Sequence, residues 1–145
     1  MSTLASINPQ VHCHAVAYWE NGVLVEAGIY SEVEVRRADY LIIETPQAYT
    51  LRQQKGDQQD LIDLAFSAGR VAAKFRNVTR TLPAAWKGQV PKPKRRSDGP
   101  YIIEHRAFKR LSAEEITVVK VPQDWKLCCD VWDAVALGLW KLGRK

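Results

Sequence analysis

The first thirty positions predict a β-meander from their pattern of apolar and polar residues. Residues 3–7 are apolar, residues 14–19 are rich in β-formers, and residues 23–30 follow directly after Glu20-Asn21-Gly22. An Asn-Gly pair between two such segments is a strong hairpin signal, because both residues tolerate the positive φ of a tight turn. The first strand is expected to end at Asn8-Pro9, since proline has no N–H for a strand ladder.

The next segments predict a buried strand, a helix and a further strand. Residues 40–43 are continuously apolar, which is typical of a central strand buried on both faces, and Glu44 stands at the end of that strand. Residues 45–56 predict a polar loop, and residues 57–74 predict a helix with one apolar face, which Asp57 or Asp60 can cap. Residues 77–82 are expected to return as a strand.

The C-terminal part predicts an exposed loop followed by helices. Prolines and glycines interrupt residues 83–100, which predicts a loop that is mobile without a ligand. Residues 101–111 predict a helix, residues 112–115 form a capping-box pattern, and residues 125–142 predict a final helix that ends at Gly143. This order of elements predicts an α/β protein with a mixed sheet and helices on one or both faces. The length of 145 residues suits one domain.

Charge is unevenly distributed along the chain. The sequence has 21 Lys and Arg against 16 Asp and Glu, a net charge of +5, which favours a polyanionic partner. Residues 87–100 hold much of the excess, and we predict that this basic loop contacts DNA phosphates. The alternative is a solvated loop that keeps the protein soluble. The basic residues are Lys87, Lys92, Lys94, Arg95 and Arg96.

Cysteine content and hydropathy exclude two classes of protein. Cys13, Cys128 and Cys129 are odd in number and two are adjacent, so they indicate no disulfide framework. No apolar segment reaches the roughly 20 residues that span a bilayer, and the N-terminus has no basic and apolar leader pattern. We therefore expect an intracellular, cytoplasmic protein that does not contact membranes.

Three acidic residues occupy positions where a site is expected. Glu44 follows a buried strand, and Asp130 and Asp133 share one face of the last helix because they are three residues apart. Carboxylates among apolar residues need a partner, and a hard cation is a natural one. The alternative is that both aspartates lie in the first turn, where the helix dipole favours negative charge. Glu44 could equally be a solvated strand end.

A second pattern of potential metal ligands is His12-Cys13-His14, which could bind a transition metal together with Cys128 and Cys129. A His-x-His pattern without a second spaced pair is far from a structural zinc pattern. Strand alternation would place His12 and His14 on one face, as satisfied or solvent-facing residues or as DNA contacts.

Four segments in order resemble those of phage-type RuvC-like Holliday junction resolvases, and the similarity covers nearly the whole chain. The segments are IIETPQ at 42–47, KGDQQDL at 55–61, WKGQVPK at 86–92 and DVWDA at 130–134, which GLW follows at 138–140.

The resemblance implies an RNase H-like fold with a mixed five-stranded sheet flanked by helices. It also implies a Mg²⁺-dependent crossover junction endodeoxyribonuclease, in which Mn²⁺ can substitute, acting as a homodimer on four-way DNA junctions in a bacterial or phage-infected cell. Glu44, Asp130 and Asp133 match the family's metal-binding acids, and Asn8 stands at the position of its first aspartate. The helix at 57–74, which carries several small residues, is expected to contribute to the dimer interface.

Asn8 separates two functional hypotheses. A carboxylate can bridge two cations, whereas an amide offers one neutral oxygen, so we expect weaker binding of at least one ion. The first hypothesis is an endonuclease impaired by Asn8. The second is a catalytically weak or inactive protein of the same fold that binds branched DNA. A third hypothesis is a small α/β interaction domain with no DNA function.

Overall fold

The computed structural model describes residues 2–46, 58–86 and 109–144 of the chain. Its strands are β1 (Thr3–Pro9), β2 (His14–Glu20), β3 (Val23–Tyr30), β4 (Tyr40–Glu44) and β5 (Val78–Thr81). Its helices are α1 (Gln58–Ala72), α2 (Pro83–Trp86), α4 (Ala113–Thr117) and α5 (Trp125–Lys141). None of the helices in these ranges combines the length and apolar character that a membrane crossing requires.

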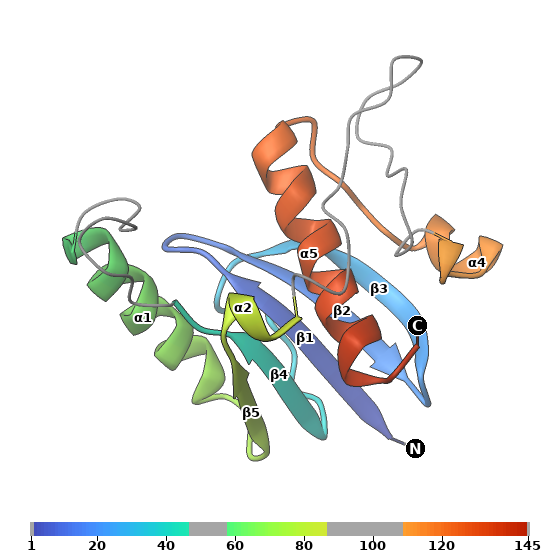
Figure 1. Cartoon of the computed structure of the whole chain (residues 1–145), viewed down its shortest axis with the longest axis horizontal. Helices are drawn as coiled ribbons and strands as arrows, with labels where there is room; N and C mark the ends of the chain where they lie inside the picture. Colours follow the sequence, from blue (N-terminus) through green and yellow to red (C-terminus); the bar gives the residue numbers. More distant parts are fainter. Residues whose placement is uncertain (1, 47–57, 87–108, 145) are drawn as a thin grey trace.

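The five strands form one mixed sheet in the order β3-β2-β1-β4-β5 (Figure 1). The first three strands are antiparallel, whereas β4 pairs parallel to β1 and β5 pairs parallel to β4. The meander turns at Asn21 and Gly22, which adopt φ values of 50° and 81°. The predicted Asn-Gly hairpin is therefore confirmed.

Helices cover both faces of the sheet and form two cores. On one face, α5 lies across β1 and β2 (Figure 1). On the other face, Ala68 and Val71 of α1 belong to a second buried cluster. The strand residues of the α5 core include Leu4, Ala15, Ala17, Trp19, Leu24, Ala27 and Ile42. Those of the α1 core include Ala5, Ile7, Val16, Leu41 and Ile43. The predicted five-stranded mixed sheet flanked by helices is confirmed.

The position of α5 on the sheet is set by a close contact and a short chain of hydrogen bonds. A Cβ atom on Gly138 would lie 2.3 Å from Trp19 Nε1, so only glycine lets the indole approach the helix this closely. Trp19 Nε1 donates to Ser6 Oγ at 3.0 Å, and Ser6 Oγ donates to the carbonyl of Ala134 at 2.7 Å. Helix α5 is thus held in one register on β1 and β2.

The start of α5 excludes the alternative that both aspartates of its acidic pair lie in the first turn. Asp124 caps the helix, and its side chain accepts a hydrogen bond from Leu127 N at 2.9 Å. The first turn contains no acidic residue, so Asp130 and Asp133 lie further along the helix. They neither open the helix nor gain from its N-terminal dipole, whose effect falls off within the first turn. The N-cap is Asp124, six residues before Asp130.

Of two other predicted boundaries, one differs from the structure and one agrees with it. The expected loop at 83–100 begins with a helical turn, α2, because Pro83 supplies a φ suited to a first helical position. The predicted end of the first strand at Asn8-Pro9 is confirmed, because β1 ends at Pro9, which pairs with His14. The rest of the expected loop, and the predicted helix at 101–111 up to residue 108, lie outside the described residues.

Candidate functional site

Asn8 and Glu44 lie at the C-terminal ends of two neighbouring parallel strands, β1 and β4. The paired positions of β1 and β4 run up to Ile7 and Ile43, so Asn8 and Glu44 occupy the next pair of positions. Side chains alternate along a strand, so Asn8 is on the same face of the sheet as Ser6, and Glu44 is on the same face as Ile42. Both Ser6 and Ile42 are on the face that α5 covers, so Asn8 and Glu44 are on that face too. Their relative exposures are 7% and 9%, so Glu44 is not the solvated strand end that the sequence allowed.

Helix α5 runs antiparallel to β1 and places Asp130 at the same edge. Gly138 lies against Trp19, which pairs with Leu4 at the start of β1, and Ala134 lies against Ser6. Four residues of helix and two residues of strand each advance by about 6 to 7 Å. Four residues along α5 lead from Ala134 to Asp130, and two residues along β1 lead from Ser6 to Asn8. Asp130 therefore lies at the level of Asn8.

The electrostatics of the β1–β2 connection agree with this position of Asp130. Burial raises the pKa of the Cys13 thiol above its ordinary value, and the negative charge of Asp130 raises it further. The charge of Asp130 thus acts on the turn between β1 and β2. Asp130 is itself buried, with a relative exposure of 9%, whereas Asp133 is half-buried.

Trp86 is a site residue that the sequence analysis did not assign to the site. Its indole Nε1 donates a hydrogen bond to Glu44 Oε2 at 2.8 Å, and the side chain is only 1% exposed. The short helix α2, which follows the end of β5, brings Trp86 to this position. The indole orients the Glu44 carboxylate and occupies one of its acceptor directions. In the sequence, Trp86 is marked by its place at the start of the WKGQVPK segment, soon after the strand predicted at 77–82.

The oxygen ligands at this edge of the sheet suit one hard cation better than two. No three His, Cys, Asp or Glu side chains within the described ranges are grouped so that they could hold a metal ion. The strand edge instead offers the buried carboxylates of Glu44 and Asp130 and the amide oxygen of Asn8. Hard divalent cations accept carboxylate and amide oxygens, but an amide cannot bridge two of them as a carboxylate does.

Comparisons with known proteins give structural likenesses only. No protein-family model matches the sequence, and no curated protein matches it. A structure of Thermus thermophilus RuvC in complex with a Holliday junction substrate is 11% identical, with a TM-score of 0.49 over 96% of this chain and 91% of that chain. A second T. thermophilus RuvC structure is 12% identical, with a TM-score of 0.49 over 98% of this chain and 97% of that chain.

The architecture of the chain itself decides the fold. Its mixed five-stranded sheet, with helices on both faces, is the architecture that the resemblance implies. The described part of the chain has the predicted α/β architecture, a mixed five-stranded sheet flanked by helices. The identities are too low for residue roles to be transferred from these structures, so the roles of Asn8, Glu44, Asp130 and Asp133 remain predictions.

The other predicted site residues lie apart from this edge of the sheet or outside the described ranges. The basic residues proposed to contact DNA, Lys87, Lys92, Lys94, Arg95 and Arg96, lie outside the described residues. The expectation that His12 and His14 share a face is wrong, because residues 10–13 form a turn rather than a strand. His12 is exposed, whereas His14 is 2% exposed and burial lowers its pKa below the ordinary value. The described part of the chain offers no transition-metal group there.

Proposed function

We propose that this protein is a structure-selective endonuclease that cleaves four-way DNA junctions with the help of a divalent metal, Mg²⁺ or Mn²⁺. The proposal rests on one observation: Asn8 and Glu44 lie at the C-terminal ends of neighbouring parallel strands, beneath the part of α5 that holds buried Asp130. Asp133 follows Asp130 after three residues and is the fourth proposed ligand. A divalent ion held by these residues would supply Lewis-acid chemistry, lowering the pKa of water and offsetting negative charge on the phosphodiester.

The protein's own residues have distinct proposed tasks. Glu44 is the central ligand, because Trp86 orients its carboxylate and the sheet fixes its backbone. Asp130 approaches from the helix side, and its burial strengthens its attraction for a cation. Asn8 holds the ion only through a neutral oxygen, so we infer that cleavage is slow compared with that of an aspartate variant.

Binding of the junction is assigned to the basic loop and to a second copy of the chain. Lys87, Lys92, Lys94, Arg95 and Arg96 are proposed to contact phosphates, which makes binding strongly salt-dependent. Two-fold symmetric cleavage needs a homodimer, and α1 is the proposed interface. In support, α1 exposes Ile62 at 59% and Phe66 at 68%, large apolar side chains that a partner helix would cover. The proposed setting is the cytoplasm of a bacterial or phage-infected cell.

A protein that binds branched DNA without cleaving it is the second candidate. The amide at position 8 favours it, as does the absence of a three-acid group among residues 2–46, 58–86 and 109–144. The indole of Trp86 on Glu44 also leaves fewer oxygen directions for a metal. In this case the fold and the basic loop serve recognition alone.

One experiment separates the two candidates. The natural protein and an Asn8→Asp variant are incubated with a synthetic four-way junction, labelled on each strand in turn, and with Mg²⁺, Mn²⁺ or a chelator. Paired metal-dependent nicks by both proteins, faster in the variant, support the endonuclease. Nicks by the variant alone support the binding protein.

Matched controls identify the source of any cleavage. Asn21→Asp makes the same chemical change in the β2–β3 turn, remote from the site, and should leave cleavage unchanged. Asn8→Asp combined with Glu44→Gln should lose the nicks. Gel shifts with junction, duplex and single-stranded DNA over a salt series test recognition. Equal weak binding to all three forms contradicts branch selectivity, and no binding at low salt contradicts any DNA function.

A further inference from the structure

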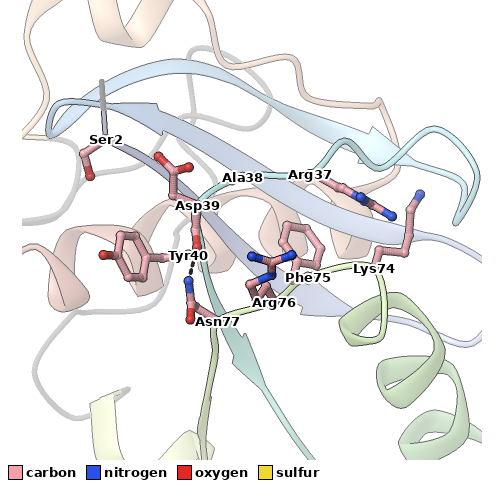
Figure 2. Close-up of a pocket in the computed structure, with 9 residues that line it drawn as sticks. All are labelled: Ser2, Arg37, Ala38, Asp39, Tyr40, Lys74, Phe75, Arg76 and Asn77. Atoms are coloured by element: carbon pink, nitrogen blue, oxygen red, sulfur yellow. Dashed lines mark hydrogen bonds between the residues drawn. The ribbon is translucent and has the colours of Figure 1, made fainter.

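A cavity of about 670 Å³ opens at the end of the sheet opposite to the proposed metal site (Figure 2). It lies where β4 and β5 begin, and its volume is in the range of small-molecule sites. Strand β4 carries Tyr40 at this end and Glu44 at the other, and four residues of strand separate them by roughly 13 Å. The cavity is therefore separate from the Asn8–Glu44 edge. Its lining is Ser2, Arg37, Ala38, Asp39, Tyr40, Lys74, Phe75, Arg76 and Asn77.

The walls of the cavity are tied together by hydrogen bonds. Lys74 Nζ donates to the carbonyls of Glu32 and Val35 at 2.6 and 2.5 Å, which fastens the end of α1 to the segment before β4. Asn77 Nδ2 donates to the carbonyl of Asp39 at 3.0 Å (Figure 2). These bonds join the two segments that form the walls. The site is consequently preformed, and binding would not require these segments to be ordered first.

Two arginines bring uncompensated positive charge to this preformed cavity. Arg37 comes from the segment before β4 and Arg76 from the connection between α1 and β5, and both line the cavity (Figure 2). Within the described ranges, neither guanidinium forms a hydrogen bond or an ion pair. By contrast, Arg36 is bound to Glu26 at 2.9 Å, and Arg70 is bound to Glu32 at 3.2 Å. The donors of Arg37 and Arg76 are available for an anion, and phosphate matches their planar geometry.

The other end of the cavity is lined by an aromatic ring and a carboxylate instead of by arginines. Tyr40 is 53% exposed there and presents an aromatic ring, and Asp39 lies beside it. Asp39 Oδ2 accepts a hydrogen bond from Thr3 N at 3.0 Å, so the carboxylate is held in place. Its negative charge repels a phosphate, whereas it accepts hydrogen bonds from hydroxyl or amino groups. A ligand with an anionic group at one end and a flat, hydrogen-bonding ring system at the other matches this arrangement.

We propose that this cavity binds a nucleotide, with the phosphate on Arg37 and Arg76 and the sugar and base against Asp39 and Tyr40. The nucleotide can be free or part of a single DNA strand, since both present a phosphate next to a base. Aromatic side chains stack on bases of any sequence, so the site has little base preference. The proposal does not depend on cleavage activity, because it uses none of the residues of the proposed metal site.

The test is a titration of the full-length protein followed by NMR and calorimetry. The probes are deoxyadenosine monophosphate, deoxyadenosine, inorganic phosphate and a short single-stranded oligonucleotide. The expected result is that the monophosphate perturbs the amides of residues 37–40 and 74–77 and binds at least tenfold more tightly than deoxyadenosine. The double variant Arg37→Gln/Arg76→Gln should bind at least tenfold more weakly. The charge-matched control Arg80→Gln/Lys141→Gln, at exposed positions outside the cavity, should stay within twofold of the natural protein.

The outcomes separate the sources of the nucleotide and can overturn the proposal. Perturbation of these amides by the oligonucleotide alone, with the same loss in the double variant, assigns the site to a DNA strand. Tyr40→Leu should reduce binding of the monophosphate to that of inorganic phosphate. An unchanged affinity in Tyr40→Leu, an equal loss in the control, or no perturbation by any probe overturns the proposal. Unchanged amide spectra and thermal midpoints of the variants show that the substitutions leave the fold intact.

Discussion

Replacement of Glu115 by glutamine should remove the strongest polar link between the C-terminal segment and the sheet. Glu115 lies in α4, and its side chain is 4% exposed. Its carboxylate accepts hydrogen bonds from Leu24 N and Ser112 N, each at 2.8 Å. It also accepts both branches of the Arg144 guanidinium, at 2.6 and 2.8 Å. One buried carboxylate thus joins β3, the α4 cap and the last residues after α5.

These donors determine the magnitude and the pH dependence of the effect. The Arg144 hydrogen bonds, aided by those from Leu24 and Ser112, lower the pKa of Glu115 from 4.5 to about 2 against the opposing effect of burial. At 1.36 kcal/mol for each pKa unit, ionised Glu115 contributes about 3 kcal/mol to folding at neutral pH. A folded-state pKa below the unfolded one gives stability that is complete above pH 4.5 and is lost as the pH falls towards 2.

The assay compares the free energy of unfolding of the natural protein and of Glu115→Gln, by urea denaturation at several pH values. At pH 7 the variant should be less stable by about 3 kcal/mol, partly because Arg144 loses its counter-charge. At pH 3 the difference should shrink to roughly half, because Glu115 is then largely protonated in the unfolded chain but still mostly ionised in the folded protein. Glu114→Gln is the control, because Glu114 is exposed on the same helix and should change stability by less than about 0.5 kcal/mol. A difference that stays constant between pH 7 and pH 3 would refute the reasoning.

Three further predictions concern α5 and the site. Gly138→Ala should destabilise the protein by about 3 kcal/mol in thermal or urea unfolding, because the new Cβ would overlap the Trp19 indole. An unchanged midpoint would contradict the position of α5 on β1 and β2. Ser6→Ala should cost about 1 to 3 kcal/mol, because Trp19 Nε1 loses its buried acceptor, and Ser6→Thr should recover part of this loss if the hydroxyl is the cause. Glu44→Ala and Asp130→Ala should each abolish metal-dependent cleavage. Both should leave junction affinity equal or higher, because a negative charge that repels phosphate is removed. A circular dichroism spectrum of an unfolded chain would instead show that these residues are needed for the fold.

Local patterns in the sequence were sufficient for most of the elements. The turn at Asn21-Gly22, the buried strand before Glu44 and the capping box between Ser112 and Glu115 all depend on residues that are close in the chain. Each pattern acts through its own backbone, so it can be recognised without knowledge of the rest of the fold. The resemblance then supplied the fold class, a mixed five-stranded sheet flanked by helices, whereas the strand order came only from the structure.

The arrangement of the candidate site was decided by tertiary structure. The parallel pairing of β1 with β4 places Asn8 beside Glu44, and the turn after β5 brings Trp86 onto the same carboxylate. Asp130 reaches this edge because Gly138 admits the Trp19 indole, and not because the aspartate begins the helix. These contacts join segments tens of residues apart, and they depend on how two cores pack on opposite faces of one sheet. Residue periodicity determines which face of an element is buried, but it contains no information about which distant element covers that face.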